Sequence, residues 1–114
     1  MIKGVCAVAV CWVKAGICGK ETTIEITKAS QTKVGVSFVT TCEHVQALAE
    51  ELIELDIGSE MTKPMVETLT YTLATKHLCR TSCVVPAAIL KAMEVTAGIF
   101  LPESCAIEFV QGAV

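Results

Sequence analysis

Three of the seven cysteines of this chain stand at the ends of predicted strands and helices rather than inside them. They are Cys18, Cys42 and Cys83. A cysteine inside an apolar element usually packs in the core, whereas cysteines at loop tips and helix starts can direct several thiolates towards one point. Such a group of thiolates binds zinc or an iron–sulfur cluster. The sequence therefore predicts a metal site with these three residues as ligands.

Three thiolates leave a fourth coordination position to be filled, and the neighbouring residues offer several candidates. Cys79 lies four residues before the third cysteine, and Glu43 and His44 directly follow the second. Water is the remaining alternative, so four candidates stand open for this position. His77 lies near the end of a predicted helix, where we expect it to interact with the helix dipole rather than with a metal.

Three further cysteines lie within predicted apolar strands. They are Cys6, Cys11 and Cys105, and we expect them to pack in the core. An odd number of cysteines would leave one unpaired in a disulfide framework. We therefore expect reduced thiols and a cytoplasmic protein, because thiols in that compartment serve as metal ligands or redox groups.

The hydrophobic pattern predicts the elements that position these cysteines. The predicted strands are residues 5–13, 22–28, 33–40 and 105–110, the predicted helices are residues 43–55, 64–77 and 86–97, and residues 57–63 are predicted to be a linker. Because the strands are grouped ahead of the helices (β-β-β-α-α-α-β), we expect an α+β fold with a mainly antiparallel sheet and helices packed on one face. At 114 residues the chain is expected to form a single domain, residues 1–114.

The predicted hairpin explains why the three cysteines should meet. It brings the start of the second strand and the end of the third strand together, so Cys18 and Cys42 become neighbours. Thr41 is expected to cap the helix that follows, with Cys42 in its first turn. Cys83 precedes the last helix, which packs back on the sheet. A helix N-terminus favours the thiolate form, so two of the three cysteines are placed where they can bind a metal.

Composition and charge exclude several function classes. Hydrophobic residues make up 53 % of the chain and charged residues 18 %, enough for a core without disulfides. The net charge is −3 and the nine basic residues are scattered, so we expect no nucleic-acid partner. No apolar run reaches the roughly 18–20 residues of a membrane span, so we expect no membrane insertion. The N-terminal apolar run is short and β-branched, which is not typical of a signal peptide.

The segments around the three cysteines resemble those of the U-type iron–sulfur cluster scaffold proteins. These segments are Gly16-Ile17-Cys18-Gly19, Thr41-Cys42, and Cys83 with the Ile89-Leu90-Lys91-Ala92 that follows it. The segments Gly16-Ile17-Cys18-Gly19, Cys42-Glu43 and Cys83-Val84-Val85-Pro86, together with Leu101-Pro102, resemble more closely a family of small uncharacterised proteins of archaea and anaerobic bacteria. The resemblance spans about residues 15–110. It implies a scaffold-like fold in which Cys18, Cys42 and Cys83 hold a cluster or zinc.

Two positions depart from the scaffold pattern. Scaffolds carry an aspartate just after the first Cys-Gly, where this chain has Lys20. They often carry a histidine just before the third cysteine, where this chain has Ser82. The resemblance associates that aspartate with cluster release. We therefore expect a stable metal site rather than transient delivery of a cluster.

These observations favour a small metal-binding protein, with a role in iron–sulfur or sulfur trafficking, over an enzyme. The first alternative is a thiol or persulfide sulfur carrier with Cys42 or Cys83 as the nucleophile. The second is a metal-free structural or interaction module. The expected partners are the metal ion or cluster and a further protein. The Val-rich first strand could form a sheet edge that pairs between two copies of the chain, which would give a homodimer.

Overall fold

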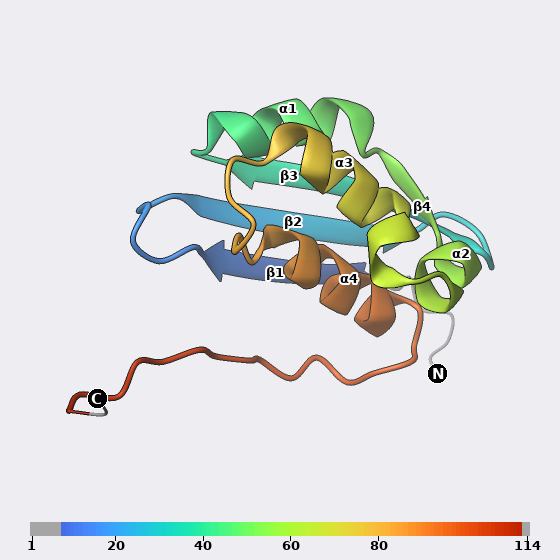
Figure 1. Ribbon diagram of the computed structural model, residues 1–114. Helices are drawn as coiled ribbons and strands as arrows, with labels where there is room; N and C mark the ends of the chain where they lie inside the picture. The colour runs from blue at the N-terminus through green and yellow to red at the C-terminus, as the bar shows by residue number, and fades with distance from the viewer. Residues whose placement is uncertain (1–7, 113–114) are drawn as a thin grey trace.

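Figure 1 shows a four-stranded antiparallel sheet with a layer of helices on one of its faces. This computed structural model describes residues 8–112. The strands lie side by side in the order β1-β2-β3-β4, which confirms the predicted α+β class. The elements are β1 (Val8–Lys14), β2 (Glu21–Lys28), β3 (Lys33–Thr40), α1 (Glu43–Glu51), β4 (Glu54–Asp56), α2 (Ile57–Thr62), a short 3-10 helix η1 (Met65–Glu67), α3 (Leu69–His77) and α4 (Val85–Thr96).

The alternating residues of β2 determine which face of the sheet is buried. Ile24 and Ile26 are fully buried, while Glu25 between them is exposed. Ile24 lies opposite Cys11 of β1 and opposite Phe38 of β3, so the three long strands share one apolar face. A slip of one residue would move this apolar set to the solvent side. The alternation therefore sets the register of the sheet as well as its buried face.

The helix layer covers the apolar face of the sheet. α4 packs across β1 and β2, α1 packs on β3, and α3 contacts both helices. Pro86 lies in the first turn of α4 and Gly98 (φ +79°) follows its end, as the sequence predicts. Full burial of one aliphatic side chain contributes roughly 1.5–3 kcal/mol, so the contact between the two layers stabilises the fold. The core includes Ile24, Ile26, Val34, Val45, Leu48, Leu52, Leu55, Val85, Ile89 and Met93.

β1 is an edge strand, as the sequence predicts, and its outward face is apolar. Val8, Val10 and Trp12 alternate with the inward residues and are exposed. The Trp12 indole N–H donates a hydrogen bond of 3.1 Å to the Glu21 carboxylate, and the Lys14 ammonium lies 5.4 Å from the centre of the indole ring. Residues 5–7 of the predicted first strand lie outside the described residues.

The predicted helix over residues 43–55 is too long. α1 ends at Glu51, and Leu55 lies instead in β4, opposite Val34 of β3. The predicted linker over residues 57–63 is also wrong, because it forms α2. Asp56 starts this helix by accepting a hydrogen bond of 2.9 Å from the Ser59 N–H. β4 has three residues, too few to show the two-residue period of a strand. In the sequence, Leu55 therefore continues the apolar stripe of α1.

The predicted last strand, residues 105–110, is also wrong. This segment is not a strand of the sheet, and it belongs to a C-terminal tail, residues 101–112, whose side chains are exposed. Figure 1 shows this tail leaving the end of α4 and running apart from the helices and strands. Cys105 is consequently exposed rather than in the core, whereas Cys11 is half-buried and packs against the core as expected. Cys6 lies outside the described residues.

Candidate metal centre

Three connections that carry cysteines lie at the same end of the sheet. Figure 1 shows the β1–β2 loop, the junction of β3 with α1 and the connection from α3 to α4 together at the left of the molecule. The antiparallel pairing of β1, β2 and β3 produces this arrangement, because β1 and β3 both end where β2 begins. α4 then starts at this end and packs along β1 and β2. The topology therefore brings the predicted ligands Cys18, Cys42 and Cys83 to one end of the molecule.

Cys18 stands at the exposed tip of the β1–β2 loop. Gly16 and Gly19 on either side of it have positive φ angles of +93° and +73°, which L side chains rarely adopt. The Gly19 N–H donates a hydrogen bond of 2.9 Å to the Gly16 carbonyl, and Ala15 N–H donates one of 3.2 Å to the Lys20 carbonyl. The loop is thus closed by its own backbone, and the Cys18 thiol faces solvent.

Cys42 is the residue at which α1 begins. It has an extended backbone, and its side chain makes no capping hydrogen bond to the helix. The predicted cap, Thr41, is wrong, because its hydroxyl accepts a hydrogen bond of 3.0 Å from the Glu21 N–H instead. The Cys42 N–H donates one of 3.0 Å to the Thr40 hydroxyl. The half-buried Cys42 thiol, which packs against the core, is therefore held at the start of the helix without a capping role.

Cys83 lies two residues before α4 and is half-buried against the core. Burial raises the pKa of its thiol most, and the Val85 N–H at the helix start lowers that pKa in part. The nearby thiols then raise the pKa of Cys83 again. These neighbours are Cys42, Cys18 and Cys79. Cys42, Cys18 and Cys79 therefore each act on the pKa of Cys83, with a smaller effect than burial.

The four thiols do not form a closed metal site as they stand. Within residues 8–112, no group of three or more histidine, cysteine or acidic side chains is arranged to hold a metal ion. Cys18 and Cys79 are exposed, whereas Cys42 and Cys83 are half-buried. The donor set suits zinc or an iron–sulfur cluster, since both bind four thiolates. Two of the thiols are thus accessible from solvent, and the other two pack against the core.

The remaining ligand candidates stand in different surroundings. Glu43 is exposed and His44 is half-buried in the first turn of α1, and neither is among the groups that shift the pKa of Cys83. His77, at the end of α3, forms a hydrogen bond between its Nε2 atom and the Glu51 carboxylate of α1. The Lys76 ammonium lies 2.9 Å from the same carboxylate. His77 therefore links α3 and α1. Among the residues proposed as the fourth ligand, Cys79 is the one that carries a thiol, as the three predicted ligands do.

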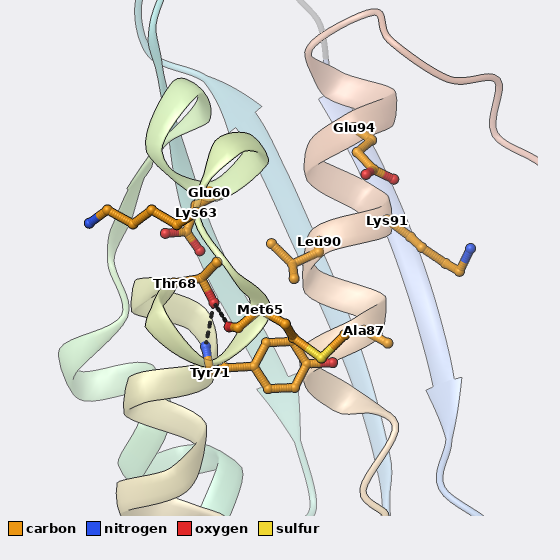
Figure 2. Close-up of a pocket in the computed structure, with 9 residues that line it drawn as sticks. All are labelled: Glu60, Lys63, Met65, Thr68, Tyr71, Ala87, Leu90, Lys91 and Glu94. Atoms are coloured by element: carbon orange, nitrogen blue, oxygen red, sulfur yellow. Dashed lines mark hydrogen bonds between the residues drawn. The ribbon is translucent and has the colours of Figure 1, made fainter.

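A shallow groove that the sequence did not predict lies between α4 and the segment from α2 to α3. Figure 2 shows its lining, and its volume is about 370 Å³. Buried Glu60 stands in this lining, but its carboxylate accepts three hydrogen bonds from Leu69 and Thr70 at the start of α3. Thr68 also caps α3 by accepting a hydrogen bond of 3.2 Å from the Tyr71 N–H. Glu60 and Thr68 of the groove thus bond the N-terminus of α3.

One family model matches this chain. It describes a family of unknown function (DUF6951) and covers residues 9–109. No curated protein and no solved structure matches the chain. In the part of the chain that the structure describes, no helix is long and apolar enough to span a bilayer.

Proposed function

Because the chain belongs to the DUF6951 family, a family of unknown function, we propose a function from its own residues: it is a small metal-binding protein. Cys18, Cys42 and Cys83 hold a zinc ion or an iron–sulfur cluster, and Cys79 supplies the fourth thiolate. Metal binding in the cytoplasm, in support of iron–sulfur or sulfur trafficking, is the role that suits such a site.

The observation that carries this proposal is the placement of Cys18, Cys42 and Cys83 at one end of the molecule, which follows from the antiparallel pairing of β1, β2 and β3 and the packing of α4 on β1 and β2. The pKa of Cys83 is raised by burial and, in part, by the neighbouring cysteines. A bound cation reverses this effect, because a metal deprotonates its thiol ligands and neutralises their charge. A metal ion bound beside Cys83 would therefore remove the part of its raised pKa that comes from the neighbouring thiols.

In this proposal, the two exposed cysteines, Cys18 and Cys79, complete the metal site. Cys42 and Cys83 pack against the core and define a fixed half of the site. Cys18 lies on a loop whose tip makes no contribution to the core, and both of its flanking glycines face open space. This loop can change conformation without disturbing the sheet. In this proposal, Cys18 and Cys79 would move towards Cys42 and Cys83 to complete a site for the metal.

A thiol or persulfide sulfur carrier is less well supported. Such a carrier needs a cysteine with a lowered pKa, since the thiolate is the nucleophile. Burial raises the pKa of Cys83 despite the hydrogen bond from the Val85 N–H, so this residue is a poor nucleophile without a metal. The metal site uses the same cysteine with its charge neutralised. The raised pKa therefore argues against sulfur transfer at Cys83.

The test is the metal content of the protein purified anaerobically without a metal-binding tag. We expect one zinc ion or one cluster per chain, with acid-labile sulfide distinguishing the two. Cys18→Ser, Cys42→Ser and Cys83→Ser should each abolish stoichiometric binding, and Cys79→Ser should weaken it. Cys105→Ser, on the exposed tail, is the matched control and should bind as the unmodified chain does. A protein that takes up no metal even after reconstitution would overturn the proposal.

A further inference from the structure

The sheet has an unpaired edge, and the same chain has a strand-like segment without a sheet. Among residues 8–112, β1 pairs only with β2, so the backbone groups on its other side face outward. An exposed edge of this kind is a template for a further strand. The tail carries a segment, residues 105–110, with the alternation and residue types of a strand. Each copy of the chain therefore contains both a strand acceptor and a strand donor.

The tail exposes large apolar side chains, which a stable monomer would be expected to bury. Phe109 is 99 % exposed, Leu101 81 % and Ile107 79 %. Scattered exposed apolar residues are common, but several in one extended segment mark a site of association. The radius of gyration is 14.5 Å, whereas a compact domain of this length is expected at about 13 Å. The molecule is thus extended by a segment that buries none of its own side chains.

We propose that residues 105–110 of one chain add to the β1 edge of a second copy, and that the exchange is reciprocal. Two copies then form a closed dimer in which each sheet gains a fifth strand. Such strand addition supplies affinity through backbone hydrogen bonds and specificity through alternate side chains. A reciprocal contact between two identical chains closes on itself, so it forms a dimer rather than a filament.

The alternation of the tail suits the two faces of the acceptor strand. Cys105, Ile107 and Phe109 form one all-apolar set, while Glu108 stands in the other set. The inward residues of β1 continue the apolar face beneath α4, and its outward residues face solvent. The apolar set of the tail therefore fits beside the inward residues. Glu108 then remains on the solvent side of the extended sheet.

The path of the tail favours pairing with the β1 edge of a second copy over pairing with the β1 edge of its own chain. Cys105 lies close enough to Cys11 to contribute to the raised pKa of that thiol, after burial. The tail thus passes within reach of its own β1, yet among the described residues no backbone hydrogen bond joins the two. Figure 1 shows the tail continuing beyond the end of β1. A segment that passes its own edge unpaired is available to another chain.

Sedimentation equilibrium of the full chain, metal-free and under reducing conditions, tests the proposal. We expect a dimer whose dissociation constant rises at least about tenfold in Ile107→Pro, because proline removes a ladder donor. Gln111→Pro, outside residues 105–110, is the matched control and should dimerise normally. On the acceptor strand, Val10→Glu should weaken the dimer, because its carboxylate would lie on the same face as Glu108 of the added tail. Val39→Glu, also on the open face but on β3, should not. Circular dichroism verifies that each variant is folded.

Two results would overturn the inference. One is a monomer at every concentration; protection of the amides of residues 105–110 from hydrogen exchange would then place the tail on its own β1. The other is a dimer that Ile107→Pro and Gln111→Pro affect equally, which would place the interface elsewhere. Neither result depends on whether the thiols bind a metal, so the metal proposal and this one fail separately.

Discussion

The carboxylate of Glu60 accepts hydrogen bonds from both the backbone N–H and the hydroxyl of Thr70, at 3.1 and 2.7 Å. Glu60 belongs to α2, whereas Thr70 lies in the first turn of α3. Both residues are buried. The negative charge stands at the N-terminus of α3, where the helix dipole and the unpaired N–H groups favour it. A carboxylate from one helix thus completes the start of another.

Replacement of Glu60 should destabilise the protein. Glu60→Ala leaves the buried N–H and hydroxyl of Thr70 without their acceptor, which should lower the free energy of unfolding by about 1–3 kcal/mol. Glu60→Gln keeps one acceptor oxygen and should cost less. Urea unfolding measures both effects. Glu67→Ala in the exposed η1 is the control and should change stability by less than about 0.5 kcal/mol. Equal losses for Glu60→Ala and Glu67→Ala would contradict this account.

The contact of Glu51 with α3 should make stability depend on pH. Hydrogen bonds from Lys76 and His77 lower the pKa of the Glu51 carboxyl below its ordinary value. A carboxyl with a lowered pKa in the folded state stabilises the protein above its unfolded pKa of about 4.3, and this stability is lost as the pH falls through the folded pKa. Glu51→Gln should therefore be less stable than the unmodified chain at pH 7, and the difference should disappear in acid.

Urea midpoints at neutral and acidic pH measure this difference. Glu50→Gln on the same helix is the matched control, since no ion pair joins Glu50 to another residue in the range 8–112. High salt should reduce the difference at neutral pH, because these charges are exposed. A Glu51→Gln effect that persists unchanged in acid would show that packing rather than charge is responsible.

The thiols should react with iodoacetamide in a defined order. Cys18 and Cys79 are exposed, whereas Cys83 is half-buried and has a raised pKa. Because the thiolate is the reactive form, Cys83 of the metal-free protein should be alkylated more slowly than either exposed thiol at neutral pH. Its rate should rise as the pH passes the ordinary thiol value of about 8.5. Peptide mass spectrometry measures each site. Fastest modification at Cys83 would instead support the sulfur-carrier alternative.

The packing of α1 on β3 should be sensitive to the loss of a single side chain. Leu48 is fully buried, so Leu48→Ala should lower the free energy of unfolding by about 2–5 kcal/mol. Ile17→Ala is the matched control, because Ile17 is a fully exposed aliphatic residue at the tip of the Cys18 loop. Its effect should stay within about 0.5 kcal/mol. Thermal or urea unfolding compares the two, and a large effect at Ile17 would reveal a contact of the loop tip.

The strands of the hairpin could be predicted because their signal is local. β2 and β3 alternate over their full length, and their predicted bounds differ from the structure by at most one residue. The helix over residues 86–97 was equally marked by Pro86 and Gly98. In contrast, Leu55 fits a helical stripe as well as it fits β4. Only the long-range pairing with β3 decides between them, and no local pattern carries that information.

The cysteine site and the tail show two further limits of local patterns. The positions of Cys18, Cys42 and Cys83 at element ends predicted their common neighbourhood through the hairpin topology. The sequence left Cys79, His44, Glu43 and water as alternatives for the fourth position, because the choice depends on the path of the connection before α4. Residues 105–110 alternate as a strand should, but alternation cannot reveal which edge, if any, the strand joins.

Trp12 is the only tryptophan in the chain, and it stands on β1 with 62 % of its surface exposed. The largest fully buried side chains within residues 8–112 include no aromatic ring. Intrinsic fluorescence of this protein therefore reports the solvent around one sheet edge and not the integrity of the core. Dilution that separates two copies should move the indole emission to longer wavelengths, while loss of the core could pass with little optical change. Trp12 fluorescence is therefore better suited to measuring association at the β1 edge than to measuring unfolding of the core.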